Sequence, residues 1–130
     1  MTPKAIRKLA LEFQRQRHPS GGGPTRATTL PSEAGARKQY PVASGVLDYF
    51  PDAIVAVSNL SWQGNNQHNP GQPLHWARDK SKDQADTMIR HFLQRGIIDT
   101  DGVPHTVKMV WRALAILQLE IERQQDVEVA

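Results

Sequence analysis

Apolar residues in the C-terminal third of the chain recur with the period of an α-helix. From Ala85 to Leu93 they are spaced i, i+3, i+4, i+7 and i+8, and a similar pattern runs from Val107 to Ile121. Apolar residues at this spacing line one face of a helix, so the pattern predicts two amphipathic helices with buried stripes. The first predicted stripe is Ala85, Met88, Ile89, Phe92 and Leu93, and the second is Val107, Val110, Trp111, Leu114, Leu117 and Ile121.

Residues that cap or stop helices lie at the ends of both patterns. Ser81 and Gln84 have the spacing of a capping box, in which the serine is the N-cap residue. Gly96 suits the C-terminal stop of the first helix. A turn is expected over residues 99–102, and Pro104 then opens the last and longest helix.

A further helical segment is predicted to start near Asp48 and to end at Gly64. Pro51 suits a first helical turn, where its missing N–H costs nothing, and the apolar residues after it keep helical spacing. The run Ile-Val-Ala-Val at residues 54–57 also fits a strand, so both interpretations stay open here. Gly64 is expected to end the segment, and residues 64–75 then form a polar loop.

The N-terminal third differs in composition from the rest of the chain. Residues 4–17 predict a basic helix, and three glycines flanked by prolines stop it. Residues 18–45 are rich in Pro, Gly, Ser and Thr, which is typical of a linker. We therefore expect an all-α protein, with a basic N-terminal helix and a flexible linker over residues 1–45 and a small helical bundle over residues 46–130.

Charge is distributed as unevenly as composition. Residues 1–40 hold eight Lys or Arg against two Glu, and residues 41–130 hold eight Lys or Arg against eleven Asp or Glu. A basic arm on an acidic body leaves open a small basic helical nucleic-acid-binding protein, whose binding would be salt-sensitive. The acidic body and the lack of a recognised DNA-binding motif make nucleic acid the less favoured partner.

Composition excludes several other classes of protein. The chain has no cysteine, which excludes disulfides, thiolate zinc sites and cysteine nucleophiles. No apolar run approaches the roughly 18 residues that span a bilayer, and no signal peptide is evident, so we expect a cytoplasmic protein without membrane contact. Apolar residues make up 38% of only 130 residues, so a second subunit is expected to complete a lean core.

Acidic, basic and histidine residues concentrate between residues 78 and 105. Asp79, Asp83, Asp86 and Arg90 are spaced i, i+4, i+7 and i+11. Carboxylates one helical turn apart can share a hard divalent cation, and an arginine beside them can hold a phosphate. The same spacing fits a charged N-terminal turn and an ordinary Asp86–Arg90 ion pair. Spacing alone favours this second interpretation for every carboxylate except Asp86.

Four cations surround the predicted start of the helix that follows Ser81. They are Arg78, Lys80, Lys82 and Arg90. A helix N-terminus also attracts anions, so the cluster suits a polyphosphate, and a solvated charged turn fits about equally well.

Two histidines lie in or next to this segment. His105 is in the first turn of the last predicted helix, close in sequence to Asp99 and Asp101. A metal ligand, a proton shuttle or a simple cap are all consistent with that position. His91 lies off the centre of its apolar face and also fits a core histidine. The polar loop supplies a different chemistry, because the amide of Asn66, His68 and the nearby ring of Trp76 are groups that can recognise a nucleobase.

Residues 46–123 resemble the phage dATP/dGTP diphosphohydrolase family, a MazG-like group of all-α nucleotide pyrophosphohydrolases. The Asp-x-x-x-Arg-His helix, followed by Asp, His and Trp, is the most specific part of the match. The resembling stretches are 47–51 (Leu-Asp-Tyr-Phe-Pro), 64–68 (Gly-Asn-Asn-Gln-His), 73–76 (Pro-Leu-His-Trp), 86–91 (Asp-Thr-Met-Ile-Arg-His) and 99–105, with Trp111 after them.

The resemblance implies an activity and a set of cofactors. MazG-like enzymes cut a nucleoside triphosphate between the α and β phosphates, and members of this group act on the purine deoxynucleotides dGTP and dATP. They use Mg²⁺ or Mn²⁺ held by acidic residues of a helix pair, and they work as dimers or tetramers. The resemblance therefore implies a metal-dependent, homo-oligomeric pyrophosphohydrolase.

The chain departs from the wider superfamily in its acidic residues. The usual signature pairs an ExxE with a later ExxD, and none of the five glutamates here forms it. Asp83 and Asp86 have the same i, i+3 spacing, so the metal role passes to aspartates with help from histidine. The implied metal ligands are Asp83, Asp86, Asp99 and His105; the implied catalytic residues are Asp86 and His91; and the implied substrate contacts are Arg78, Lys82 and Arg90 for phosphates, and Asn66, His68 and Trp76 for the base.

Overall fold

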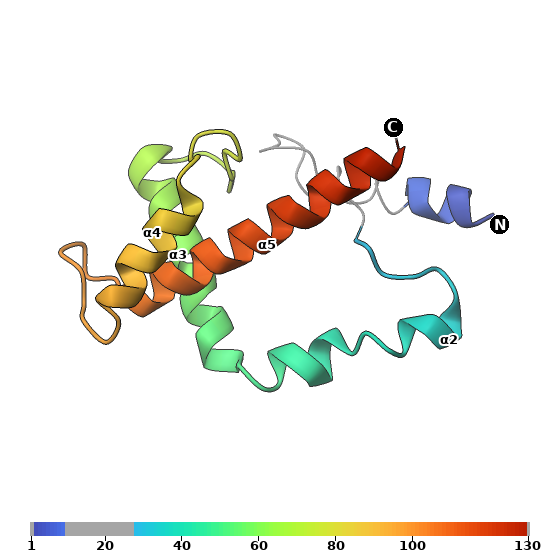
Figure 1. The fold of residues 1–130 in the computed structure, drawn as a ribbon, viewed down its shortest axis with the longest axis horizontal. Helices are drawn as coiled ribbons and strands as arrows, with labels where there is room; N and C mark the ends of the chain where they lie inside the picture. Colours follow the sequence, from blue (N-terminus) through green and yellow to red (C-terminus); the bar gives the residue numbers. More distant parts are fainter. Residues whose placement is uncertain (1, 10–27, 130) are drawn as a thin grey trace. The chain divides into compact units, whose positions relative to one another are not determined.

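The computed structural model describes residues 2–9 and 28–129 and is mostly helical (Figure 1). Residues 3–9 are helical, in agreement with the start of the predicted basic helix, and the rest of that helix lies outside the described residues. No strand is found in the described part of the chain, which confirms the all-α class. The further elements are α2 (Ala34–Arg37), a π-helix η1 (Ala43–Leu47), α3 (Pro51–His68), α4 (Gln84–Leu93) and α5 (His105–Val129).

The chain divides into two compact units. Residues 1–54 and 65–77 form the first, and residues 55–64 and 78–130 form the second, so α3 contributes to both. The first unit contains α2 and η1, which replace part of the predicted linker with short helical segments. The predicted boundary near residue 45 stays a prediction. No helix in the described ranges combines the length and the apolar character needed to cross a membrane.

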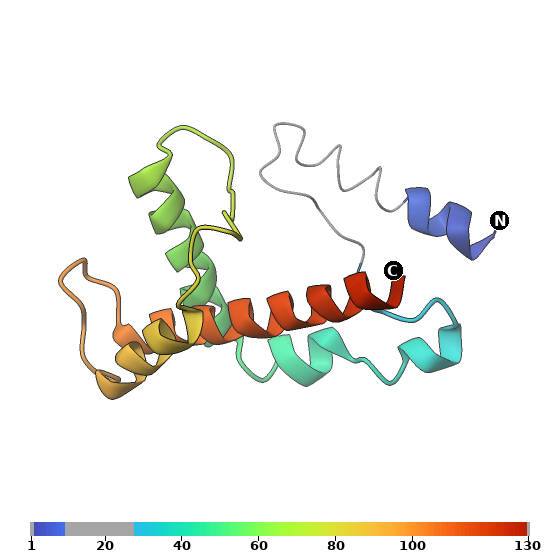
Figure 2. The ribbon, with the colours of Figure 1, turned by 45° about the horizontal axis from the view of Figure 1, so that its top comes forward.

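Helix α3 is longer than the sequence predicts. It continues through Gly64, which was expected to end it, and reaches His68 (Figure 2). A glycine inside a helix lowers helix stability by only about 1 kcal/mol relative to alanine, and the neighbouring helical turns offset this loss. Pro70 supplies the actual stop, because the residue before a proline avoids the helical region; here that residue is Asn69, whose φ is −138°. The strand-like run at 54–57 is therefore helical.

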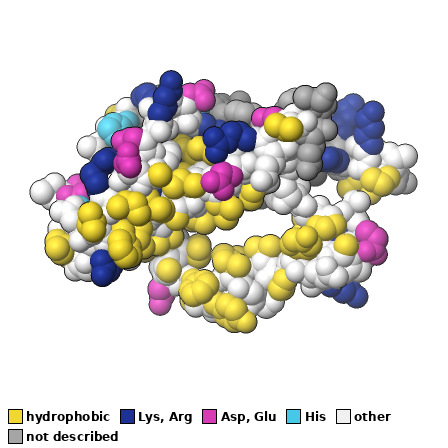
Figure 3. Space-filling model, in the orientation of Figure 1, with side chains coloured by type: hydrophobic (Ala, Val, Ile, Leu, Met, Phe, Trp, Pro, Cys, Tyr) yellow, Lys and Arg dark blue, Asp and Glu magenta, His cyan; other side chains and the backbone are white. Residues whose placement is uncertain are grey.

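Helix α4 packs along α5, but most of its predicted apolar stripe is exposed and only Met88 of that stripe is half-buried. Gln84 and Thr87 are its buried residues, each 8% exposed. Ile89, Phe92 and Leu93 are 49%, 43% and 71% exposed, so the prediction that they are buried is wrong. Figure 3 shows hydrophobic side chains at the surface over this part of the molecule.

Hydrogen bonds explain why α4 turns a polar face toward α5. Arg112 of α5 donates from one guanidinium nitrogen to Gln84 Oε1 at 2.8 Å and to Ser81 Oγ at 3.0 Å. Thr87 Oγ1 accepts from Arg90 at 2.7 Å and donates to Asp83 at 3.2 Å. Buried polar groups are tolerated when they have such partners, and hydropathy alone does not reveal them.

The predicted capping box at Ser81 is also wrong. The N-cap residue is Asp83, whose carbonyl accepts the first helical hydrogen bond from Thr87 N. The Ser81 hydroxyl is engaged elsewhere, since it donates to Asp83 Oδ1 and accepts from Arg112. Helix α4 therefore begins at Gln84, and its start is connected to α5 through Arg112.

Helix α5 buries fewer apolar side chains than its predicted stripe contains. Leu114 and Leu117 are 47% and 53% exposed, whereas Ala115 is 4% exposed. Trp111 Nε1 donates to Ser61 Oγ at 2.9 Å, which links α5 to the part of α3 that belongs to the same unit. The buried hydrophobic residues of the described chain are Val57, Val103 and Ala115.

Candidate metal centre

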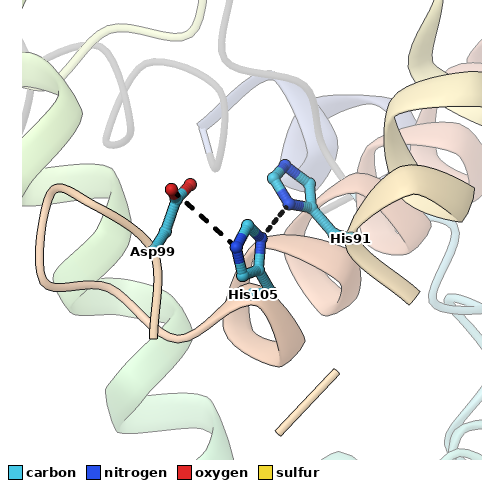
Figure 4. A group of neighbouring side chains, drawn as sticks. All are labelled: His91, Asp99 and His105. Atoms are coloured by element: carbon cyan, nitrogen blue, oxygen red, sulfur yellow. Dashed lines mark hydrogen bonds and ion pairs between the residues drawn. The ribbon is translucent and has the colours of Figure 1, made fainter. Parts of the chain in front are cut away.

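Three side chains that could ligate a metal meet at the junction of α4, the following turn and α5. His91 comes from α4, Asp99 from the turn, and His105 is the first residue of α5 (Figure 4). One ligand atom from each lies within 4.8 Å of those of the other two. No other group of three such residues was found in the described ranges, so this is the candidate metal centre.

The two imidazoles are in direct contact. His91 Nδ1 lies 2.8 Å from His105 Nδ1, and the ring centroids are 5.1 Å apart. Two N–H groups cannot donate to each other, so at least one of these nitrogens is unprotonated and carries a lone pair. His105 Nε2 faces the carboxylate of Asp99, 3.8 Å from its Oδ1 (Figure 4). His105 therefore lies between His91 and Asp99.

The turn before α5 is closed by backbone hydrogen bonds, as the sequence predicts. Asp99 N donates to Val103 O at 2.9 Å, and His105 N donates to Ile97 O at 3.0 Å. Gly102 has a φ of +83°, a conformation that L side chains rarely adopt, which explains the glycine at this position. The closed turn brings Asp99 back beside the first residue of α5.

Lys108 fixes the orientation of the carboxylate. Its Nζ lies 2.7 Å from Asp99 Oδ2 and 2.6 Å from Asp101 Oδ2. Lys108 follows His105 by three residues, so the two side chains lie on the same face of α5. The Lys108 hydrogen bond, followed by the backbone N–H of Thr100, lowers the pKa of Asp99 to about 2. Asp99 is therefore ionised throughout the physiological range.

Lys108 itself stays protonated. Burial acts to lower the pKa of Lys108, but its hydrogen bonds to Asp101 and Asp99 outweigh burial, and the net pKa is raised. Burial, and then the charges of His105 and Lys108, lower the pKa of His91. Around neutral pH the centre thus combines a neutral imidazole with an ionised carboxylate, the forms that bind metals.

The other implied metal ligands do not join this centre. Asp83 accepts hydrogen bonds from Ser81, Thr87 and Arg90, and the Arg90 bond is the main cause of its lowered pKa. Asp86 is exposed on α4. Neither belongs to a group of three ligands within the described residues. Of the four implied ligands, the structure brings together Asp99 and His105, and it adds His91, which the resemblance implied as catalytic.

The implied phosphate contacts are dispersed along the segment. Arg78 Nε pairs with Glu122 Oε1 at 3.2 Å, and Glu122 is 6% exposed. Arg90 pairs with Asp83 at 3.4 Å and remains largely exposed, as does Lys82. Arg90 and Lys82 are therefore accessible to an anion, whereas Arg78 is held against α5.

The implied base contacts belong to the first unit. Asn66 and His68 lie in the last turn of α3 rather than in a loop, and both are exposed. Trp76 is half-buried in the segment that follows. These residues belong to the other unit, and the three-residue ligand group contains none of them.

Lys108 and Arg112 are the residues that sequence reasoning missed. Lys108 follows His105 by three residues, so helical spacing could have placed it beside His105. No comparable signal points to Arg112, whose partners lie 28 and 31 residues away.

The donor set fits one of the two implied metals better than the other. Two imidazoles and one carboxylate suit Mn²⁺, which accepts nitrogen as well as oxygen ligands. Mg²⁺ prefers an octahedral set of oxygens, and this centre offers a single carboxylate. Comparisons with protein-family models, curated proteins and solved structures found no match, so the family resemblance stays a prediction.

Proposed function

We propose that this chain is a metal-dependent hydrolase of the purine deoxynucleoside triphosphates dGTP and dATP, releasing the monophosphate and pyrophosphate. One observation carries the proposal: His91, Asp99 and His105 form a compact ligand group inside the segment whose motifs resemble that family. The exposed cations Arg90 and Lys82 lie at the adjoining helix and suit a polyanionic substrate.

The residues divide into four roles. His91, Asp99 and His105 would hold Mn²⁺, which when bound would act as a Lewis acid toward the phosphates. Lys108 keeps Asp99 ionised and oriented, so the carboxylate is ready before substrate arrives. Arg90 and Lys82 would neutralise charge on the β and γ phosphates, the main task in phosphoryl transfer. Asn66, His68 and Trp76 remain our candidates for contacts to the purine.

The proposal includes a homo-oligomer that acts on the free nucleotide pool of the cytoplasm. Its support is the exposed apolar face of α4 and the following turn, which a second copy would cover. The residues of this face are Ile89, Phe92, Leu93, Ile97 and Ile98.

The test is to incubate the protein with dGTP and Mn²⁺ and to separate the products. dGMP and pyrophosphate are expected in equal amounts; release of orthophosphate without pyrophosphate would contradict the cleavage site. Asp99→Asn should reduce turnover by orders of magnitude, with the fold checked by circular dichroism. Asp86→Asn is the matched comparison, because it changes the same functional group on the neighbouring helix. Loss of activity in Asp86→Asn, but not in Asp99→Asn, would indicate that the metal binds at Asp86 instead.

A further inference from the structure

We propose that the metal centre selects a first-row transition-metal ion, such as Mn²⁺, Co²⁺ or Zn²⁺, and discriminates against Mg²⁺ and Ca²⁺. The inference rests on the proposed function for the role of the metal, but binding itself needs no nucleotide. It departs from the Mg²⁺ that the family resemblance allows, and it follows from three properties of the centre.

The first property is the chemistry of the donors. The centre offers two imidazole side chains and one carboxylate, and Lys108 already neutralises part of that carboxylate charge. Ca²⁺ takes six to eight oxygens, and Mg²⁺ gives up its waters only reluctantly. Imidazole suits transition ions such as Zn²⁺, and the affinity of a nitrogen-containing site generally rises from Mn²⁺ to Co²⁺. Nitrogen donors with little negative charge therefore favour the transition ions.

The second property is the burial of His105. It is 6% exposed, and its two nitrogens face His91 and Asp99 (Figure 4). The contact with His91 joins two ring nitrogens 2.8 Å apart, at least one of which carries an unshared lone pair. A cation bound between the two rings would replace the proton that this contact shares, in a part of the site where His105 is nearly closed to water.

The third property is the rigidity of the carboxylate. Lys108 holds Asp99 Oδ2 at 2.7 Å, and the backbone N–H of Thr100 donates to Oδ1 at 2.7 Å. Oδ1 is the oxygen nearer His105, and a carboxylate oxygen has a second lone pair that a metal could take beside the Thr100 N–H. Lys108 is accordingly a positioning residue. Outer partners that orient ligands typically contribute about 10–100-fold to metal affinity.

The test titrates the full-length protein, without nucleotide, with each metal alone. Calorimetry should give Mn²⁺ and Zn²⁺ binding at least about tenfold tighter than Mg²⁺ binding, and Co²⁺ should develop visible absorption typical of nitrogen ligation. His91→Gln should abolish the Co²⁺ spectrum, whereas His75→Gln, which replaces an exposed histidine outside the metal centre, should leave it unchanged. Lys108→Met should weaken Mn²⁺ binding by about 10–100-fold without removing the Co²⁺ absorption.

Several results would overturn the inference. Equal affinity for Mg²⁺ and Mn²⁺, or an unchanged Co²⁺ spectrum in His91→Gln, contradicts it directly. Because His105 is buried and its replacement could unfold the chain, the test depends on His91 and Lys108 instead. Selective metal binding without dGTP hydrolysis would defeat the proposed function alone, and hydrolysis with Mg²⁺ bound outside these residues would defeat this inference alone.

Discussion

Lys108 Nζ lies 2.7 Å from Asp99 Oδ2, and this contact holds the carboxylate of the metal centre in place. The pair joins the turn to the first helical turns of α5. The Asp99 carboxylate is also bonded to the backbone N–H of Thr100. The charge of the centre is thereby fixed by the fold rather than by the metal.

The stability of the protein should depend on pH through Asp99. Its pKa is about 2 in the folded protein and near 3.8 in an unfolded chain, so its contribution is complete above about pH 4 and is lost as the pH falls toward 2. Urea unfolding followed by circular dichroism should therefore give a smaller loss of stability between pH 5 and pH 2.5 for Asp99→Asn than for the unchanged protein. Identical pH profiles would contradict the Lys108–Asp99 contact.

Arg112 should be essential for the packing of α4. Arg112→Met leaves the buried Gln84 side chain without its partner, which should cost about 1–3 kcal/mol of the free energy of unfolding. Arg123→Met changes an exposed arginine of the same helix and should cost far less. A similar loss in both variants, measured by urea denaturation, would refute a specific role for Arg112.

Two glycines should respond in opposite directions to the same substitution. Gly102→Ala forces a side chain into a left-handed turn at φ +83° and should destabilise the fold by about 1–2 kcal/mol. Gly64→Ala replaces a helical glycine whose added Cβ would meet nothing within 4 Å, and should stabilise by up to about 1 kcal/mol. Thermal unfolding compares the two, and a destabilised Gly64→Ala would argue against an uninterrupted α3.

The exposed apolar face should control assembly. Leu93 is 71% exposed, so Leu93→Lys should leave the fold intact but shift a homo-oligomer toward monomer in light scattering. Val127→Lys provides the control, because Val127 is 76% exposed on α5 and lies far along the chain from this face. An unchanged mass for Leu93→Lys would remove this face from any subunit interface.

The sequence predicts which segments are helical better than it predicts which faces are buried. Periodicity finds α4 and α5, but it assigns burial to Ile89 and Phe92, whereas the packed face holds Gln84 and Thr87. The reason is physical: a polar side chain is buried where a donor reaches it, and Arg112 comes from 28 residues away. Gly64 was misread because one weak helix former cannot end a helix that its neighbours support.

The candidate site was predictable where its residues are close in sequence. Asp99 and His105 flank one turn, so their proximity follows from the turn itself. The approach of His91 depends on how α4 lies against α5, which local spacing does not encode. Asp86 has suitable chemistry, but α4 presents it on an exposed face, away from the three-residue group.

The polar contact between α4 and α5 has a final consequence. Two apolar helix surfaces can shift past one another with little change in energy, whereas paired hydrogen-bond donors and acceptors match in only one register. Arg112 donates hydrogen bonds to Gln84 and Ser81 at the beginning of α4, so a shift of that helix by a single residue would break both hydrogen bonds. The Arg112 guanidinium therefore fixes the register of α4 against α5. That register in turn sets the distance between the imidazoles of His91 and His105, two helical turns away.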